Sequence, residues 1–142
     1  MEKKRDWFEN ESFWAQYAPV LFDAQRWAEA PSVAEGILHI IGAANVEGKE
    51  GPAILDAGCG PGRISVELAA RGARVTGVDI IRPFLNAALE SAQDEGVELE
   101  LVQADLRTFS RPGAFDAAVS LYTSFGYCDT IEEDMTILRN IA

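Results

Sequence analysis

AILDAGCGPGRISVELAARGARVTGVD, at residues 53–79, is the stretch of sequence that decides the fold. An apolar run leads into Asp56, and three glycines follow, each separated by one residue: Gly58, Gly60 and Gly62. Glycines at this spacing allow a sharp turn and let a ligand approach the main chain closely. The stretch therefore predicts a strand, a glycine-rich turn, a helix that begins at Arg63, and a second strand that ends in Asp79.

The acid at the end of the second strand indicates a nucleoside ligand. A carboxylate in that place can accept hydrogen bonds from both hydroxyls of a ribose, which would be the role of Asp79. A dinucleotide-binding turn has the spacing G-x-G-x-x-G, whose last glycine would fall where this sequence has Arg63. A nicotinamide-dependent oxidoreductase is therefore the weaker alternative, and a fold of this kind with an ordinary turn and no ligand is another.

Taken together, the strand, Asp56, the spaced glycines, the helix and Asp79 resemble motif I and the following acidic loop of class I S-adenosylmethionine-dependent methyltransferases. The resemblance implies an α/β fold, a three-layer Rossmann-like parallel sheet with strand order 3-2-1-4. It also implies S-adenosyl-L-methionine as the cofactor, S-adenosyl-L-homocysteine as its product, and methyl transfer as the activity. An N/D-P-P-Y motif is absent, and the S-F-G-Y string at residues 124–127 favours a small-molecule acceptor.

The resemblance also assigns the cofactor-binding residues. The glycine loop would hold the methionine part, Asp79 the ribose and Asp105 the adenine, although an ordinary turn or capping acid is the alternative for Asp105. Leu121 and Tyr122 would line the side of the methyl group. The full predicted set is Asp56, Gly58, Cys59, Gly60, Gly62, Asp79, Ile80, Asp105, Leu106, Leu121 and Tyr122.

The first thirty residues carry many aromatic side chains, namely Trp7, Phe8, Phe13, Trp14, Tyr17, Phe22 and Trp27. We expect one or two helices there, at residues 9–18 and 21–28. The aromatic rings either pack this segment onto the sheet or form a lid in which Trp14 and Tyr17 face a sulfonium. We expect a helical lid at residues 1–48 and the cofactor-binding domain at residues 49–142.

Four shorter patterns predict further elements. S-x-x-E at residues 32–35 and T-x-x-E at residues 130–133 are capping boxes, which mark helix starts. Residues 97–101 alternate between apolar and acidic, as in a half-exposed edge strand. Residues 114–121 are apolar almost throughout, which predicts a strand buried on both faces and hence central in the sheet.

Composition limits the partners and the compartment. A chain of 142 residues with 48% apolar and 25% charged residues fits one globular domain. The formal net charge of −11 disfavours a nucleic-acid partner, and neither a signal peptide nor a membrane-spanning run is present. Cys59 and Cys128 have neither metal-site spacing nor a disulfide framework, so we expect no metal and a cytoplasmic location.

The family that the sequence resembles continues beyond the fourth strand with a fifth strand, another helix and an antiparallel pair. We therefore expect either the N-terminal part of a longer enzyme, or a homo-oligomer that pairs through the fourth strand and the last helix. The first hypothesis for function is a methyltransferase that acts on a small molecule. The alternative is a cofactor-binding module or an inactive methyltransferase fragment.

No catalytic residue is assigned from the sequence. A general base is needed only if the acceptor must lose a proton that it carries. Tyr17, His39 and Tyr127 could act in that way, but each is more often structural. His39 in particular is expected at the surface.

Overall fold

A computed structural model describes residues 5–43, 50–122 and 125–142 of the chain. Its parallel sheet has the strand order β3-β2-β1-β4, which confirms the predicted fold class. The strands are β1 (Ala53–Ala57), β2 (Arg74–Asp79), β3 (Glu100–Gln103) and β4 (Ala117–Val119). The helices are η1 (Trp7–Glu9), α1 (Glu11–Leu21), α2 (Ala24–Ile40), α3 (Arg63–Ala70), α4 (Arg82–Glu95) and α5 (Ile131–Ile141).

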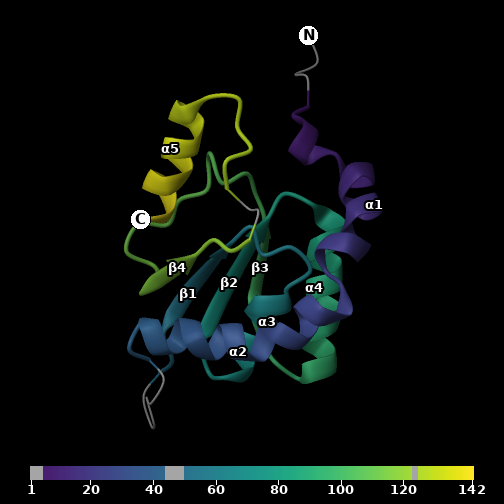
Figure 1. The fold of residues 1–142 in the computed structure, drawn as a ribbon. Coiled ribbons are helices and arrows are strands. Elements are labelled where there is room, and N and C mark those ends of the chain that lie inside the picture. Colours follow the sequence, from purple (N-terminus) through teal and green to yellow (C-terminus); the bar gives the residue numbers. More distant parts are fainter. Residues whose placement is uncertain (1–4, 44–49, 123–124) are drawn as a thin grey trace.

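The sheet has a separate apolar core on each face, because successive side chains of a strand point to opposite sides. Ile54 of β1 packs with buried residues of α2 and α3. Leu55 and Ala57 pack instead with Val78 and with partly buried side chains from residues 104–115 and from α5. The sheet therefore lies between two covering layers, and α5 and α1 flank the carboxyl ends of its strands (Figure 1).

The N-terminal helices differ from the prediction. Asp23 caps α2 by accepting a hydrogen bond from the Arg26 amide at 2.9 Å, and the helix continues through Pro31 to Ile40. The predicted helix start at residues 32–35 is therefore wrong. Ser32 lies inside α2 and donates its hydroxyl to the Glu29 carbonyl. A continuous buried face holds the helix together across the proline, and its members are Ala30, Ala34, Ile37 and Leu38.

The outer strands are shorter than predicted. β3 lies at the edge of the sheet, as expected, but begins at Glu100 rather than at residue 97. β4 covers three residues and pairs only with β1 among the described strands, which is the edge position that the predicted strand order gives it. The further prediction that this strand is buried on both faces is wrong. Its middle residue, Ala118, is exposed. Asp116 turns the chain into β4 by accepting the Ala53 amide on its side chain and donating its own amide to the Ala53 carbonyl.

Gly62 and Gly77 lie in closely packed surroundings near the glycine turn. A Cβ atom at Gly62 would lie 2.6 Å from the Cβ of Ala88, so this glycine lets α3 approach α4. A Cβ atom at Gly77 would lie 3.0 Å from Cys59 Sγ and 3.1 Å from Leu101 Cδ2. The lack of a side chain at Gly62 lets α3 pack closely on α4, and the lack of one at Gly77 lets the glycine turn pack closely on β2.

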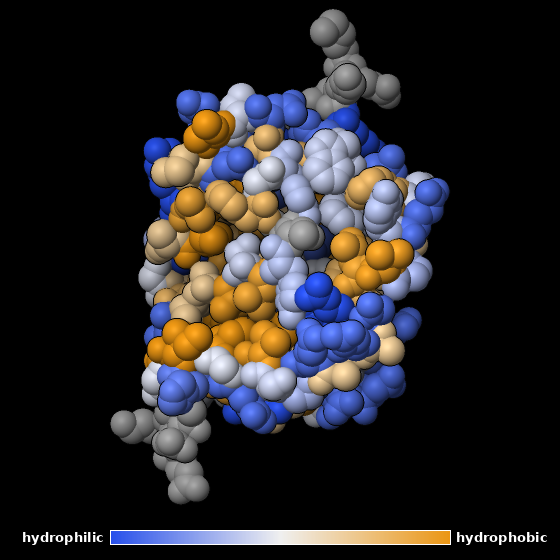
Figure 2. Space-filling model, viewed as in Figure 1, coloured by the Kyte–Doolittle hydropathy of each residue, from blue (hydrophilic) through white to orange (hydrophobic). Residues whose placement is uncertain are grey.

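The last helix begins as predicted. Thr130 caps α5 by accepting the Glu133 amide at 3.2 Å. Ile137 is its buried residue, whereas three other apolar residues of the helix are exposed: Ile131, Met135 and Leu138. Figure 2 shows that apolar residues also gather on the surface between α5 and α2.

The boundary expected between the helical segment and the sheet domain, at residues 48 and 49, lies outside the described residues. Within the described ranges, no helix is long and apolar enough to cross a membrane.

Candidate functional site

A pocket of about 640 Å³ opens at the carboxyl ends of the strands. This size lies within the range of small-molecule and cofactor sites. Every predicted site residue except Gly62 lines it: Asp56, Gly58, Cys59, Gly60, Asp79, Ile80, Asp105, Leu106, Leu121 and Tyr122. The carboxyl ends of parallel strands meet at one edge of a sheet, which brings these positions together although they follow four different strands.

The glycine turn presents main chain to the pocket. The amides of Gly58 and Cys59 both donate to the Val78 carbonyl, at 2.8 and 3.0 Å, which fixes the turn against β2. Gly60 has a φ of +56°, and a Cβ atom there would lie 3.3 Å from the Phe22 ring. The turn therefore lies close against Phe22, and a side chain at position 60 would crowd this ring.

Cys59 directs its side chain beneath this turn. The side chain is buried against Gly77, and its Sγ lies 3.6 Å from the Gly60 carbonyl oxygen. Burial, with smaller effects from Asp56 and Asp79, raises the pKa of the Cys59 thiol well above its ordinary value. The thiol is therefore a packing group and a weak nucleophile.

Asp79 joins the end of β2 to the glycine turn. One carboxylate oxygen accepts the Gly60 amide at 2.8 Å, and the other accepts the Ile81 amide at 2.9 Å. Burial raises the pKa of Asp79, and these hydrogen bonds oppose the rise. A carboxylate oxygen has two lone pairs, so this arrangement still allows each oxygen to accept from a ligand hydroxyl.

Asp56 is the most buried acid of the pocket, with 3% of its surface exposed. The hydroxyl of Ser65, in α3, donates to its Oδ2 at 2.6 Å. Burial raises the pKa of Asp56 to about 6, although the Ser65 hydrogen bond lowers it. This group therefore titrates close to neutral pH.

Asp105 is engaged by a neighbouring cation. Arg107 donates from Nε to both carboxylate oxygens, at 3.0 and 3.1 Å, and from Nη2 to Oδ2 at 2.7 Å. The same guanidinium pairs with Asp6 at 3.0 Å and with Glu133 at 3.1 Å. Arg107 thus joins the predicted adenine-binding loop to the N-terminal segment and to α5. Sequence reasoning missed this cluster, because Asp6 and Glu133 lie far from Arg107 in the chain.

Aromatic rings form the outer wall of the pocket. The N-terminal helices and their connection contribute three of the lining rings, α4 one, and the loops after β4 two: Phe8, Trp14, Phe22, Phe84, Tyr122 and Tyr127. Trp14 Nε1 donates to the Phe8 carbonyl at 2.7 Å, and its ring lies 5.9 Å from that of Tyr127. Of the two predicted lid residues, Trp14 lines the pocket, whereas Tyr17 stacks on Phe13 and is half exposed.

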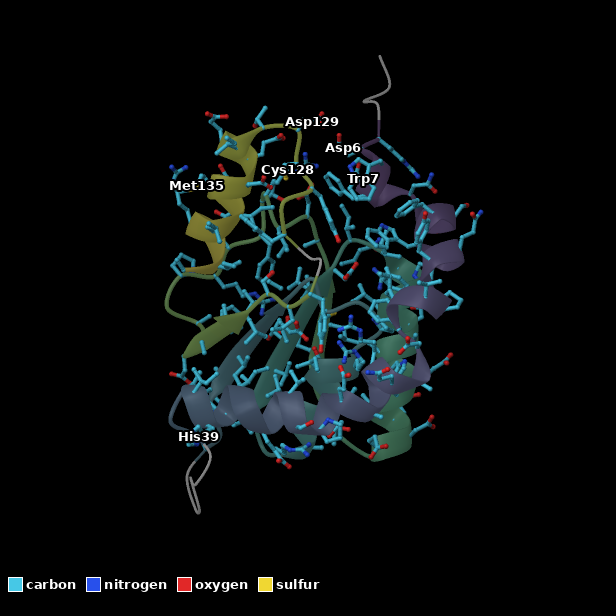
Figure 3. All side chains as sticks on the ribbon, viewed as in Figure 1. Asp6, Trp7, His39, Cys128, Asp129 and Met135 are labelled. Atoms are coloured by element: carbon cyan, nitrogen blue, oxygen red, sulfur yellow. The ribbon has the colours of Figure 1, made fainter. Side chains whose placement is uncertain are left out.

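The three residues considered as bases lie in different places. Tyr127 lines the pocket, whereas Tyr17 does not. His39 is exposed near the end of α2, far from Trp7 and Cys128 at the upper rim (Figure 3).

Ser124, in the predicted S-F-G-Y string, lies outside the described residues. Within the described part of the chain, no group of three His, Cys, Asp or Glu side chains could hold a metal ion.

Two arginines of the pocket were not predicted. Arg63 is the first residue of α3, and Arg26 is in α2. Both guanidinium groups lie over the ring of Tyr122, at 4.3 and 5.0 Å from its centroid. The only sequence signal was that Arg63 occupies the place of the last glycine of a dinucleotide-binding turn.

Comparison with known proteins gives the family context of this site. The model of the family described as "methyltransferase domain" matches residues 54–142. Cypemycin N-terminal methyltransferase from a Streptomyces species is 37% identical over 93 residues, which are 66% of this chain and 37% of that protein. Ubiquinone biosynthesis O-methyltransferase from Aeromonas salmonicida is 35% identical over 94 residues, which are 65% of this chain and 38% of that protein.

A solved structure adds a similarity in fold. Magnesium protoporphyrin IX methyltransferase from Synechocystis, with bound S-adenosylmethionine, superposes with a TM-score of 0.62 and 25% identity, covering 78% of this chain and 52% of that one. The matched part thus spans less than two fifths of the length of the two sequence relatives. It spans about half of the length of the Synechocystis enzyme.

Proposed function

Because the chain belongs to the methyltransferase-domain family, we propose that it binds S-adenosyl-L-methionine and transfers the methyl group of this cofactor to a small-molecule acceptor. The observation that carries the proposal is the convergence of the glycine turn, Asp79, Asp105 and Tyr122 on one pocket. The names of the relatives that act in ubiquinone biosynthesis and on a protoporphyrin support a small acceptor.

The pocket residues fit the parts of this cofactor. The backbone of the glycine turn would hold the methionine end, and the carboxylate of Asp79 would accept hydrogen bonds from the ribose hydroxyls. Asp105 and Leu106 would contact the adenine, and Leu121 and Tyr122 would lie along the methyl side. Three acids and several aromatic rings line the pocket, and both favour a sulfonium cation.

The protein's part in the reaction is alignment and exclusion of water. The cofactor supplies a methyl group that is already activated on a sulfonium for direct displacement. The aromatic wall would exclude water and hold the acceptor in line, an effect that contributes up to ~7–11 kcal/mol in well-oriented cases. No residue is assigned as a general base, and Tyr127 is the candidate that lines the pocket.

Calorimetric titration of the chain with S-adenosyl-L-homocysteine tests this proposal, with NAD⁺ as the control ligand. We expect saturable binding of the first ligand alone. In thermal unfolding, a ligand at about 100 times its dissociation constant adds ~2.7 kcal/mol of stability. Binding of NAD⁺ instead would favour the oxidoreductase alternative, and binding of neither ligand would refute a nucleoside site.

A second candidate is a module that binds the cofactor without turnover. It is supported by the fact that the predicted cofactor residues all lie within residues 54–142, whereas no catalytic residue is assigned. Incubation with methyl-labelled cofactor and a panel of small aromatic hydroxyl and amine acceptors separates the two. Label in any acceptor establishes the enzyme, and binding without label transfer favours the module.

Two further proposals concern assembly and compartment. Pairing of two copies through β4 and α5 is supported by the exposed Ile131, Met135 and Leu138. Met135 points outward from α5 in Figure 3, so Met135→Lys should shift a dimer to monomer in sedimentation.

A reducing, cytoplasmic compartment is supported by the two free cysteines, Cys59 and Cys128.

A further inference from the structure

Ser65 of α3 and Asp56 of β1 form a hydrogen-bonded pair inside the protein. The Ser65 hydroxyl donates to Asp56 Oδ2 at 2.6 Å, and the exposed fractions of the two residues are 0% and 3%. Asp56 lies near the end of β1 and lines the pocket, whereas Ser65 does not. The pocket thus contains a buried acid that has no role in the methyl transfer proposed above, held by a serine that no ligand touches.

The burial of Asp56 opposes folding at neutral pH. Burial raises the pKa of this carboxyl to about 6, although the Ser65 hydrogen bond lowers it. At neutral pH the folded chain must therefore keep a charge in a site that is shielded from water, which is unfavourable. An uncharged residue would avoid this cost, so an acid kept at the lining of a pocket indicates a use for its charge.

Ser65 is the group that does most to keep Asp56 ionised. The charge of Asp79, at the end of β2, raises the pKa of Asp56. The charge of Arg63, in α3, lowers it, but less than the Ser65 hydrogen bond does. Three further neighbours, on β2, on β4 and in the glycine turn, carry no charge: Gly77, Val119 and Cys59.

The ionised form of Asp56 favours a positively charged ligand in the pocket. Opposite charges attract more strongly in a partly buried site than in water, because the effective dielectric constant is lower there. Protonation of Asp56 removes this attraction and leaves the other contacts of the pocket in place. The protonation state of this one acid therefore changes how well the pocket accepts a cation.

We propose that Ser65 is a positioning residue of the pocket: its hydroxyl holds the Asp56 carboxylate in the ionised form and thereby sets the pH below which the pocket loses affinity for a cationic ligand. Ser65 acts through Asp56, because it does not itself line the pocket. The role rests on the proposed function only for the identity of the cation, S-adenosyl-L-methionine, whose sulfonium gives it a net positive charge.

Calorimetric titrations of the whole chain between about pH 5 and about pH 8 test this role with two ligands. S-adenosyl-L-methionine is cationic, whereas 5′-methylthioadenosine has the same nucleoside and no charge. Since both contain the ribose, pH effects that they share, including that of Asp79, cancel in the ratio of their dissociation constants. The variants are Ser65→Ala and Asp56→Asn. Ser32→Ala is the matched control, because Ser32 is an exposed serine of α2 outside the pocket lining.

In the unmodified chain, affinity for S-adenosyl-L-methionine relative to 5′-methylthioadenosine should fall roughly 10-fold from about pH 8 to about pH 5, because most Asp56 is then protonated. Ser65→Ala should move the midpoint of this fall upward by about one pH unit, since the ionised form loses a hydrogen bond. Asp56→Asn should abolish the fall. A merely structural role of Ser65 would weaken both ligands at every pH and leave the midpoint in place.

The role is overturned if Ser65→Ala and the Ser32→Ala control have the same midpoint, or if the relative affinity of the unmodified chain does not change with pH. Should Ser65→Ala fail to fold, Ser65→Cys takes its place, because a thiol is of similar size and is a weak donor. The same two outcomes then decide.

Failure of the proposed function has a different signature, namely that the unmodified chain binds neither ligand. The effect of Ser65 on Asp56 is then decided on the free chain by nuclear magnetic resonance, which follows the titration of the Asp56 carboxyl carbon. A higher midpoint in Ser65→Ala than in the Ser32→Ala control supports the positioning role, and equal midpoints refute it.

Discussion

The carboxylate of Asp79 accepts a hydrogen bond from the amide of Gly60 at 2.8 Å, which ties the end of β2 to the glycine turn after β1. This bond holds together the two segments that would contact the ribose and the methionine end of the cofactor. Asp79 therefore stabilises the glycine turn even when no ligand is bound.

Replacement of this acid should affect both stability and binding. We expect Asp79→Asn to lower the free energy of unfolding by about 1–3 kcal/mol, because the amide group accepts on one side only and Asp79 accepts on both. Affinity for S-adenosyl-L-homocysteine should fall roughly 10-fold. Urea unfolding and calorimetry measure the two effects. Asp94→Asn, at an exposed site in α4, is the control, and equal behaviour of the two variants would contradict the assigned role.

Asp56 should make the protein less stable as the pH rises. Its pKa is raised by burial from 3.8 to about 6, so between these values the folded state binds a proton that the unfolded state has released. The stability from this group is present below pH ~4 and is lost as the pH rises through ~6, on the order of 3 kcal/mol in total.

The variant Asp56→Asn tests whether Asp56 lowers the free energy of unfolding as the pH rises. It keeps an oxygen that can accept from Ser65 and carries no charge at any pH. The difference in unfolding free energy between Asp56→Asn and the unmodified chain should therefore grow in favour of the variant from about pH 4 to about pH 7. Urea titrations at these two values measure it, and a constant difference would show that Asp56 keeps its ordinary pKa.

Gly62 should resist substitution, whereas Gly36 should not. Alanine at position 62 would need a φ of +83° and would put its Cβ 2.6 Å from that of Ala88, so we expect a loss of about 2–4 kcal/mol. Gly36 lies inside α2, where an added Cβ atom would meet nothing within 4 Å, and Gly36→Ala should gain about 0.5–1 kcal/mol. Thermal unfolding compares the two, and similar melting temperatures would contradict the close packing of α3 on α4.

Arg107 should hold the N-terminal segment in place. Arg107→Gln removes charge-assisted bonds to Asp105, Asp6 and Glu133, which we expect to cost about 1.5–3 kcal/mol. Amide hydrogen exchange should become faster in residues 7–21. Arg111→Gln, which breaks a more exposed pair with Glu100, should cost about 0–1 kcal/mol and leave that exchange unchanged. Unchanged exchange in both variants would argue against this anchoring role.

The parts of the fold that depend on local sequence could be predicted. The glycine turn and Asp79 follow from a short motif, and the connection rule predicts that the strands are parallel. The strand order was predicted by the resemblance to the family. The length of α2 could not be predicted, since the burial of Ala34 and Ile37 against α3 outweighs the break signalled by Pro31. The predicted burial of β4 on both faces was wrong for a related reason: apolar residues predict burial, but not which neighbours supply it.

The site shows the same division. The predicted cofactor residues lie at strand ends, where topology alone brings them together. Arg26 and the Asp6 contact of Arg107 could not be assigned, because the residues that they contact lie on elements that come together only through tertiary packing. Arg63 had a local signal, its place directly after Gly62, but the motif alone does not show that its charge is buried.

The burial of Cys59 has a practical consequence. Cys59 lines the pocket but only 7% of the residue is exposed, so the labelling rate of its thiol reports the free energy of the local opening that admits a reagent. The protein thus carries a kinetic probe beside its own pocket. Any compound that binds on the turn will slow the reaction of Cys59, which is measured separately from that of the less buried Cys128.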